Sequence, residues 1–321
     1  MPLIKALALT LLLNTVLPGG HVQARFTRTP CPGQTIAMIT WRGETDAEKG
    51  FVEGLRQHRP QIAITRYHAD QNLARLQRII TDIGKHPVDL IYVFGTTATQ
   101  TVLKRVRKTP VVFNVVNQPV ITGIIQSWDH SGNNAVGVSN QVPVDNQLKA
   151  LKKVVPFKRL GLIYNPREPN STIQRDIAFQ LQKSLGFKLV DFKIAFPSEM
   201  APVLSTLKGA VDAVFIPADS LMISMGRDLA GHLNELQLPS LGTVDTLVKD
   251  HGLLLGMQPS YYQLGLLAAQ KADRILQGEK PSDIPSSRLE FFQIIVNMRT
   301  ARQIGVQIPM AMLIIANTIV R

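Results

Sequence analysis

Short apolar runs alternate with longer amphipathic stretches along the whole chain. The apolar runs, which are rich in β-branched residues and which we expect to be strands, cover residues 34–41, 62–67, 90–94, 111–113, 135–139, 159–164, 188–194, 213–216, 238–241, 253–257 and 291–297. The stretches that we expect to be helices cover residues 45–58, 72–84, 98–108, 144–154, 171–185, 200–208, 221–236 and 261–277. Strands that alternate with helices of this length predict an α/β fold built on doubly wound parallel sheets.

One stretch of the sequence occurs twice, which indicates an internal duplication. Residues 88–98 (VDLIYVFGTTA) return as residues 211–220 (VDAVFIPADS), and each copy is an apolar run that ends in small polar residues. A helical stretch precedes each copy, and a second helix and a short strand led by proline follow it. Because parallel sheets bind ligands at the carboxyl ends of their strands, two such units predict two lobes, joined by a hinge, around one cleft.

The order of the elements predicts where the two lobes begin and end. We expect lobe 1 over residues 25–143 with part of 258–285, and lobe 2 over residues 144–257 with part of 286–321. The chain is then expected to cross the hinge at least twice, near Val142-Pro143 and near Met257-Gln258. A chain of 321 residues is long enough to give each lobe its own hydrophobic core.

Residues 1–24 are expected to be a secretory signal peptide. Lys5 supplies a positive start, residues 6–17 are apolar, and Val22-Gln23-Ala24 has the small-residue pattern of a cleavage site. A membrane span needs roughly 20 apolar residues, and this run is shorter. The only cysteine, Cys31, lies too far beyond the cleavage site for a lipid anchor, and it excludes an intramolecular disulfide. We therefore expect a soluble periplasmic protein cleaved near Ala24.

The basic composition has several possible explanations. The net charge of +12 suits nucleic acid, an anionic membrane surface or an anionic small ligand. However, the densest clusters, in residues 104–108 and 152–159, lie at expected helix ends, where cations face solvent and favour the helix dipole. No RNA-binding aromatic signature or helix-turn-helix pattern is present, so we expect no nucleic-acid partner. The seven histidines show no metal-ligand spacing, and we expect neither a metal nor a cofactor.

A series of motifs is shared, in order, with one bacterial family. The motifs are Trp41-Arg42-Gly43 with Gly50-Phe51, Val88-Asp89-Leu90-Ile91, Pro110-Val111-Val112-Phe113, residues 134–139 (NAVGVS), residues 161–165 (GLIYN), Glu168 with Asn170-Ser171, Val211-Asp212-Ala213, residues 261–265 (YYQLG), residues 275–281 (ILQGEKP) and residues 296–301 (VNMRTA). In these residues the chain resembles the ABC-transporter substrate-binding proteins of the tryptophan/tyrosine-transporter type, which have the type I periplasmic-binding-protein fold. The resemblance implies capture of an amino acid, an aromatic compound or another small organic solute, closure of two lobes over it, and delivery to an ABC permease.

The candidate ligand-binding residues are polar or aromatic side chains in loops that follow strands or begin helices. They are Trp41, Arg42, Thr96, Thr97, Asn117, Asn165, Glu168, Asn170, Ser171, Asp219, Asp245 and Ser260. Thr96 and Thr97 begin a helix, where hydroxyls and free backbone N–H groups suit a carboxylate. Trp41 can stack on a ring, Arg42 can bind an acid, and Asp219 and Asp245 are candidate partners for an ammonium group.

Each of these candidates also has a structural explanation. The threonines can cap a helix, which is compatible with ligand binding. Trp41 can cover the core while Arg42 pairs with Glu44 or Asp46. Asp219 and Asp245 both stand at helix starts, where an aspartate cap needs no ligand. The sequence leaves these alternatives open.

Two positions depart from the family pattern. Ser260 stands before the paired tyrosines, where we expect an aspartate in the family, so a ligand ammonium group loses a charged partner. Pro166-Arg167 brings a cation into a loop that we expect to be small and neutral. Together with the basic composition, these departures favour a neutral or anionic ligand.

An enzyme is the less favoured class. The sequence has no Gly-x-Gly-x-x-Gly after a strand, no Walker loop, no Gly-x-Ser-x-Gly and no His-Glu-x-x-His, so we expect a binding protein and not an enzyme. We expect this binding protein to be a monomer. A hydrolase on a two-lobed scaffold would need a carboxylate pair across the cleft, for which Glu168 and Asp219 are the candidates. A ligand sensor for a membrane receptor kinase or cyclase is a further alternative, since a receptor and a permease bind the same closed conformation.

Overall fold

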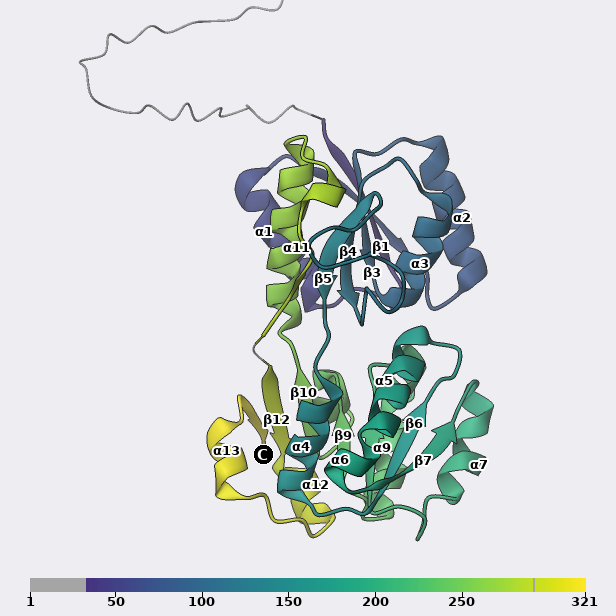
Figure 1. Cartoon of the computed structure of the whole chain (residues 1–321), viewed down its shortest axis with the longest axis vertical. Coiled ribbons are helices and arrows are strands. Elements are labelled where there is room, and N and C mark those ends of the chain that lie inside the picture. The colour runs from purple at the N-terminus through teal and green to yellow at the C-terminus, as the bar shows by residue number, and fades with distance from the viewer. Residues whose placement is uncertain (1–32, 291) are drawn as a thin grey trace, which may run out of the picture. The chain divides into compact units, whose positions relative to one another are not determined.

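Two β-sheets, one in each lobe, organise the fold (Figure 1). The structure is a computed structural model that describes residues 33–290 and 292–321. The expected signal peptide, its cleavage site and Cys31 lie outside the described residues. The chain passes between the two sheets at residues 140–143 and 259–260, near the two places expected from the sequence, and a third time between residues 288 and 293, which agrees with the expectation of at least two crossings.

The sheet of lobe 1 is parallel throughout, in the order β11-β5-β4-β3-β1-β2. Its strands are β1 (Thr35–Thr40), β2 (Ala63–His68), β3 (Leu90–Phe94), β4 (Val111–Val116), β5 (Ala135–Ser139) and β11 (Ser287–Arg288), the last reached through the 3-10 turn η2 (Pro281–Asp283). Helices α1 (Asp46–His58) and α11 (Tyr261–Leu276) cover one face, and α2 (Leu73–Lys85) and α3 (Thr96–Arg105) cover the other (Figure 1). Because both faces are covered, β3 and β4 are buried along their whole length.

The sheet of lobe 2 has the order β13-β12-β10-β9-β8-β6-β7. Its strands are β6 (Arg159–Tyr164), β7 (Lys188–Lys193), β8 (Ala213–Ile216), β9 (Ser240–Gly242), β10 (Leu255–Gln258), β12 (Gln293–Asn297) and β13 (Thr318–Val320). This sheet is not purely parallel, because β12 runs antiparallel to β10. The chain leaves β10 at the hinge end and returns there to begin β12, so the two strands point in opposite directions.

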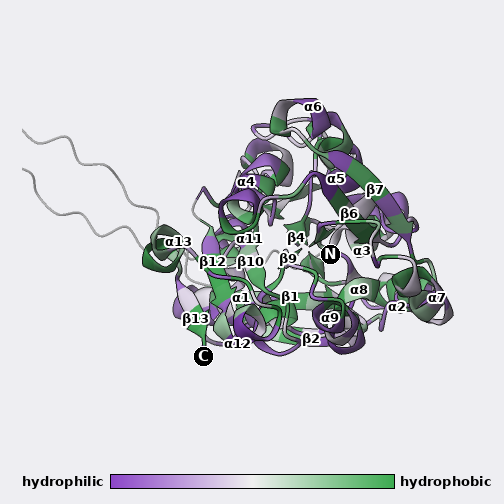
Figure 2. Ribbon diagram, turned by 90° about the horizontal axis from the view of Figure 1, so that it is seen from below, coloured by the Kyte–Doolittle hydropathy of each residue, from purple (hydrophilic) through white to green (hydrophobic). Residues whose placement is uncertain are grey.

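Two hydrophobic clusters cover the two faces of the lobe 2 sheet. One contains residues of α4 (Val144–Val154), α5 (Pro169–Gln180), α12 (Met298–Gln303) and α13 (Met310–Ile315). The other contains residues of α7 (Met200–Ser205), α8 (Ser220–Ser224), α9 (Gly226–Glu235) and α10 (Asp245–Lys249). Figure 2 shows the result: β6 in the sheet interior is largely hydrophobic, whereas hydrophobic and hydrophilic residues alternate along the edge strand β7.

The repeated sequence corresponds to a repeated structure. The strand order β2-β1-β3-β4-β5 of lobe 1 recurs as β7-β6-β8-β9-β10 in lobe 2. Asp89, which precedes β3, accepts a hydrogen bond of 2.7 Å from the backbone N–H of Thr35 at the start of β1. Asp212, which precedes β8, accepts one of 2.7 Å from the N–H of Arg159 at the start of β6. The repeated Val-Asp motif thus joins the starts of two neighbouring strands in each lobe.

Helices α1 and α11 pack closely against each other because each contributes a glycine. A Cβ atom on Gly50 of α1 would lie 2.2 Å from the carbonyl oxygen of Tyr262. A Cβ atom on Gly265 of α11 would lie 2.2 Å from the carbonyl oxygen of Ala47. The sequence motifs that contain these two glycines therefore have a packing role.

Several elements differ from their predicted bounds. The helix predicted over 221–236 is divided into α8 and α9, and the one predicted over 171–185 into α5 and α6 (Gln182–Leu185). The first division lies at Met225, directly before Gly226, where a Cβ atom would lie 2.5 Å from the His251 ring. The helix predicted over 200–208 ends at Ser205 and is preceded by the turn η1 (Pro197–Glu199). Elements α10, α12, α13, β11 and β13 were not predicted, because each is too short to show a clear period.

Candidate functional site

A small cavity lies where the loops at the carboxyl ends of the strands of both lobes meet. Lobe 1 contributes Trp41, Arg42, Phe94, Gly95, Thr96, Thr97, Val115, Asn117 and Tyr261, and the first hinge crossing contributes Asn140. Lobe 2 contributes Glu168, Asn170, Ala218 and Ser220. The cavity volume of about 30 Å³ has room for only a water molecule or two. A larger hollow of about 710 Å³ shares Arg42 and Tyr261 with it.

The N-terminus of α3 opens onto this cavity. Gly95 is the N-cap residue, with φ of +93° and no side-chain cap bond, so neither threonine caps the helix as the structural alternative assumed. The backbone N–H groups of Thr96 and Thr97 lie in the first turn and have no carbonyl partner within the helix. The Thr96 hydroxyl oxygen accepts a bond of 3.2 Å from the N–H of Asn117. This end of α3 therefore offers hydroxyl and N–H donors to an anionic group.

Aromatic rings and Arg42 form one wall. The rings of Phe94 and Tyr261 lie with centroids 6.3 Å apart. The Arg42 guanidinium lies 5.2 Å from the Phe94 centroid and donates a 3.3 Å hydrogen bond to the Tyr261 hydroxyl. Arg42 therefore does not pair with the two acidic residues that the sequence offered as partners. Those acids bind other cations: Glu44 pairs with Arg66 at 2.8 Å, and Asp46 pairs with Lys49 at 2.9 Å.

Three buried polar atoms at the cavity have no hydrogen-bond partner within the described chain. They are Nε1 of Trp41, Oδ1 of Asn117 and Oδ1 of Asn140. Buried polar atoms in proteins are nearly always paired, so a group of unpaired ones needs an explanation. The three residues that carry this donor and these two acceptors line the same cavity, which is the arrangement expected where a polar ligand binds.

Glu168 supplies the acidic group of the cavity. Its carboxylate accepts bonds of 3.1 and 3.2 Å from the backbone N–H of Ser220. Burial, and after it the negative charge of Asp219, raise the pKa of Glu168 to about 7, whereas the charge of Arg42 acts in the opposite direction. The carboxyl group of Glu168 can therefore change its protonation state near neutral pH.

Asp219 lies behind the cavity and is occupied by backbone donors. Its carboxylate accepts bonds from the N–H groups of Asn165 (2.6 Å), Leu221 (3.0 Å) and Met222 (3.1 Å). Burial raises the pKa of Asp219, and these N–H groups oppose the shift. Asp219 caps α8, as its structural alternative predicted. The hydrolase alternative is not supported by this geometry, because Glu168 and Asp219 both belong to lobe 2 and Asp219 does not line the interlobe cavity.

The remaining candidates fall into three groups. Asn165 and Ser171 line neither hollow; the Ser171 hydroxyl donates a 2.7 Å bond to the carbonyl of Asn165 and holds the loop after β6. Asn170 lines the small cavity and donates to the carbonyl of Ala218. Asp245 and Ser260 line the larger hollow instead.

Asp245 and Ser260 have local partners of their own. Asp245 pairs with Lys249 at 2.9 Å and is the first residue of α10, whereas the N-cap position is Val244. Ser260 caps α11 by accepting a 3.4 Å bond from the N–H of Gln263. The serine that replaces the expected aspartate therefore still fills the N-cap position of α11.

Several cavity residues were missed from the sequence. Phe94, Asn140 and Tyr261 line the cavity but were not among the candidates. Asn140 directly follows β5 and Phe94 ends β3, so the strand-end rule applied to every strand finds both. Tyr261 follows a hinge crossing, and only the folded chain brings it to the end of β3.

The fold and the cavity together define a class. Two α/β lobes with the same strand order and a polar cavity at the carboxyl ends of both sheets are the architecture of a two-lobed solute-binding protein. A family model described as "ABC transporter substrate binding protein" matches residues 35–320. The chain belongs to this family. It is therefore a substrate-binding protein of an extracytoplasmic family and not an enzyme, as the motifs in the sequence indicated.

The chain is similar to several known proteins. It is 29% identical over 266 residues to the tyrosine-binding protein of Clostridioides difficile strain R20291. The matched residues make up 81% of this chain and 77% of that protein. The structure matches the ABC domain from Streptococcus pneumonia in complex with L-Trp with a TM-score of 0.84, 20% identity, and coverage of 89% and 99% of the two chains. It matches the ligand-free, open structure of a Clostridium difficile substrate-binding protein with adhesive properties with a TM-score of 0.70, 26% identity and the same coverage. These matches confirm the type I periplasmic-binding fold.

Residues 33–290 and 292–321 contain no group of three or more His, Cys, Asp or Glu side chains able to hold a metal ion. None of the helices that the structure describes has the length and apolar character to cross a membrane.

Proposed function

We propose that this protein binds an aromatic α-amino acid of the tyrosine or tryptophan type in the cavity between its lobes and delivers it to an ABC permease. The observation that carries the proposal is the set of unpaired buried atoms, Trp41 Nε1, Asn117 Oδ1 and Asn140 Oδ1, around one cavity. The tyrosine-binding relative and the L-Trp complex of similar fold support the same ligand class.

Each part of such a ligand has a suitable partner. The ligand carboxylate is assigned to the N-terminus of α3, where the N–H groups and hydroxyls of Thr96 and Thr97 are donors. The ammonium group is assigned to the carbonyl oxygens of Asn117 and Asn140 and to the carboxylate of Glu168. The aromatic ring is assigned to a wall of aromatic side chains, which consists of Trp41, Phe94 and Tyr261.

The acidic group in this assignment comes from lobe 2. The sequence alone favoured a neutral or anionic ligand, because Ser260 lacks a carboxylate. Glu168 offers a carboxylate at the cavity itself, and a ligand ammonium beside it would favour its ionised form. We therefore prefer a zwitterionic amino acid.

Capture is expected to involve hinge motion. The cavity volume is about 30 Å³. Typical ligand pockets have volumes of roughly 300–1,000 Å³, which is about ten to thirty times as large. An amino acid can therefore enter only when the lobes move apart at the three crossings, and closure then surrounds it. We place the mature monomeric protein in the periplasm after cleavage near Ala24, with an ABC permease as its membrane partner because of its family.

Calorimetric titration of the mature chain tests the proposal. L-Tyrosine and L-tryptophan are expected to bind. Tyramine, which lacks the carboxylate, and 3-(4-hydroxyphenyl)propionate, which lacks the ammonium group, are expected to bind at least about tenfold more weakly, because each leaves buried charged or polar groups unpaired. If the propionate binds as tightly as tyrosine, the ammonium assignment is wrong. If no aromatic amino acid binds, the ligand class is wrong.

Trp41→Phe tests directly whether the unpaired Nε1 of Trp41 takes part in ligand binding. The variant keeps a ring but removes the unpaired N–H, so tyrosine affinity should fall about 2- to 12-fold. The free energy of unfolding of the ligand-free protein should not fall, because the N–H group that is removed is buried without a partner and does not stabilise the fold. Trp128→Phe is the matched control: Trp128 lies under Arg288, away from the cavity, and its replacement should leave affinity unchanged.

A further inference from the structure

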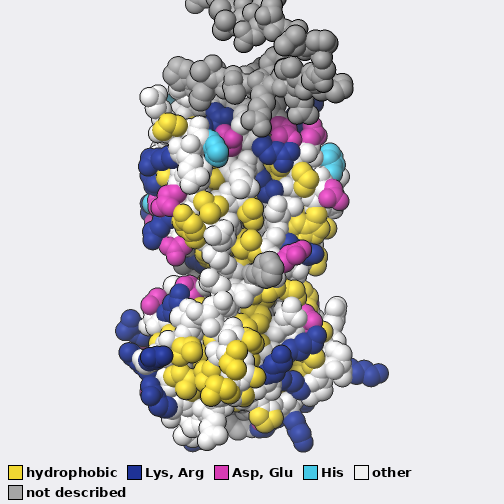
Figure 3. Space-filling model, turned by 90° about the vertical axis from the view of Figure 1, so that its left-hand side faces the viewer, with side chains coloured by type: hydrophobic (Ala, Val, Ile, Leu, Met, Phe, Trp, Pro, Cys, Tyr) yellow, Lys and Arg dark blue, Asp and Glu magenta, His cyan; other side chains and the backbone are white. Residues whose placement is uncertain are grey.

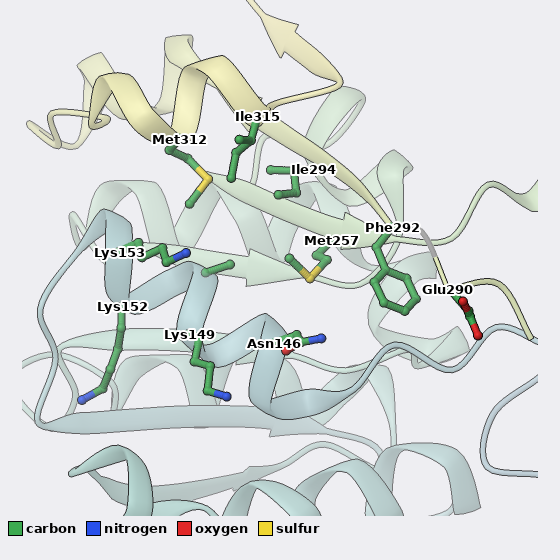
Figure 4. Close-up of a pocket in the computed structure, with 11 residues that line it drawn as sticks. Asn146, Lys149, Lys152, Lys153, Met257, Glu290, Phe292, Ile294, Met312 and Ile315 are labelled. Carbon is green, nitrogen blue, oxygen red and sulfur yellow. The ribbon is translucent and has the colours of Figure 1, made fainter.

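A groove on lobe 2, separate from the interlobe cavity, runs between α4 and α13 over strands β10 and β12 (Figure 4). Its volume is about 570 Å³, within the range of small-molecule sites. It is lined by Asn146, Lys149, Ala150, Lys152, Lys153, Met257, Glu290, Phe292, Ile294, Met312 and Ile315. The groove exists because α13, with six residues, covers only part of the sheet face beside α4.

The floor and one wall of the groove are apolar. Met257 and Ile294 rise from β10 and β12, and Met312 and Ile315 descend from α13 toward them (Figure 4). Phe292 closes the end near the hinge crossing. Figure 2 shows α13 as a hydrophobic helix, and Figure 3 shows hydrophobic side chains gathered on this face of lobe 2 with Lys and Arg side chains beside them. Contiguous exposed apolar surface of this kind usually marks a binding site.

The opposite wall supplies the cations, and one of them is free. Lys149 pairs with Asp145 at 2.9 Å. Lys152 lies 5.0 Å from the centroid of the Phe157 ring and donates to the carbonyl of Gly186 at 3.3 Å. Lys153 is exposed and has no hydrogen bond or ion pair within the part of the chain that the structure describes. Lys153 lies toward the Met312 end of the groove, and Glu290 lies at the Phe292 end (Figure 4).

We propose that this groove is a second ligand site, which binds an amphipathic monoanion made of a carboxylate and an unbranched alkyl chain. The carboxylate lies at Lys153, and the chain lies along Met312, Ile294 and Met257 toward Phe292. A second carboxylate on the far end of the chain would meet Glu290 and be repelled. The groove therefore selects an alkanoate over the dicarboxylate of the same length.

A chain-length series is the first test. Hexanoate, octanoate, decanoate and decanedioate are titrated into the mature chain by calorimetry, below their micellar concentrations, with and without saturating L-tyrosine. Each added methylene that enters the groove should tighten binding about fourfold. Decanedioate should bind more weakly than decanoate, and tyrosine should change neither result. The proposal is overturned if the affinity does not depend on chain length, if decanedioate binds as tightly as decanoate, or if tyrosine competes with decanoate.

Two pairs of matched variants are the second test. Ile315 lines the groove and is 50% exposed, whereas its neighbour Ile314 is 75% exposed and does not line it. Ile315→Asn should weaken decanoate binding about fivefold, and Ile314→Asn should not. Lys153→Gln should weaken it about two- to fivefold, and Lys158→Gln, at an exposed lysine outside the groove, should not.

The outcomes of the variant test are all decisive. Equal losses in the two isoleucine variants would mean a broad apolar docking surface and not a groove site. An unchanged Lys153→Gln affinity would mean that the anion is not recognised. All four positions are exposed or half exposed, so the variants should fold, and melting curves verify this. Unchanged affinity for L-tyrosine in all four shows that any loss belongs to the groove.

Discussion

The carboxylate of Asp219 accepts a hydrogen bond of 2.6 Å from the backbone N–H of Asn165. This bond joins the loop that follows β6 to the N-terminus of α8. The two segments also carry Glu168 and Ser220, which line the interlobe cavity and are bonded to each other. Asp219 is fully buried and does not line the cavity, so it positions the lobe 2 side of the site without facing the ligand.

Asp219→Ala is expected to destabilise the protein strongly. The change leaves the buried N–H groups of Asn165, Leu221 and Met222 without their acceptor, so the free energy of unfolding should fall by about 2 kcal/mol or more. Urea unfolding measures the change. Asp129→Ala, at an exposed loop aspartate, is the control and should have little effect. An Asp219→Ala protein as stable as the parent would show that these bonds contribute nothing.

The stability of the ligand-free protein should depend on pH through Glu168. Its pKa is about 7 in the folded protein and has an ordinary value of 4.5 in the unfolded chain. Between these values the folded protein holds a proton that the unfolded chain releases, so the free energy of unfolding should fall as the pH rises from 4.5 to 7, by on the order of 3 kcal/mol.

Glu168→Gln isolates this effect. The glutamine variant cannot titrate, so its free energy of unfolding should change less with pH than that of the parent between about pH 5 and 7, a range that lies between the two pKa values. Urea unfolding at several pH values measures the slopes. The contribution of Asp219 has the same sign and remains in both proteins, because burial raises its pKa as well. Parallel slopes for the parent and the variant would contradict the assignment.

Tyr92→Phe should destabilise lobe 1. The Tyr92 hydroxyl donates a 2.7 Å bond to the carboxylate of Glu48 and accepts one of 3.1 Å from Asn114, and all three side chains are buried. Loss of the hydroxyl leaves a buried carboxylate with one donor fewer, so the free energy of unfolding should fall by about 1–3 kcal/mol.

A tyrosine whose hydroxyl bonds at the surface provides the matched control for this change. Tyr262 donates a 2.6 Å bond to Glu53 at the surface, where water replaces the lost partner. Tyr262→Phe should therefore have a much smaller effect than Tyr92→Phe in the same urea titration. Equal effects of the two substitutions would show that burial does not determine the strength of this interaction.

Gly50→Ala and Gly231→Ala should change stability in opposite directions. Alanine favours a helix over glycine by roughly 0.5–1 kcal/mol, so Gly231→Ala, where a Cβ atom meets nothing within 4 Å, should stabilise α9 by about that amount. At Gly50 the new Cβ atom would lie 2.2 Å from the carbonyl oxygen of Tyr262, so α1 and α11 must separate and the protein should be destabilised. Differential scanning calorimetry compares the two melting temperatures. Stabilisation by Gly50→Ala would contradict the close helix contact.

Local pattern was enough for much of the fold. Elements β3, β5, α4, β6 and β8 have the bounds that their sequence predicts. Each is an unbroken apolar run or a clear helical period with turn residues at both ends, so local preference and tertiary packing agree. The repeated Val-Asp motif was equally informative, because the aspartate is needed at the same place in both lobes to join the starts of neighbouring strands.

The site was recovered less completely. Trp41, Thr96, Asn117 and Glu168 follow strands or begin helices, and the strand-end rule places them at the cavity. Asn165 and Ser171 meet the same rule, yet they face the loop interior, since Ser171 bonds the carbonyl of Asn165. Sequence position puts a residue in the right loop but does not determine which way its side chain points.

The sequence by itself determined the fold class, the duplication and the family, because these depend on periodicity, on repeated motifs and on residues that act within one element or between neighbouring strands. Only the tertiary structure decided that the rings of Tyr261 and Phe94 lie side by side and that Arg42 contacts the Phe94 ring and not the acidic residues near it in sequence. It also decided that a groove lies between α13 and α4. These contacts join segments that are distant in the chain, and their partners are selected by burial and charge only after the segments have packed.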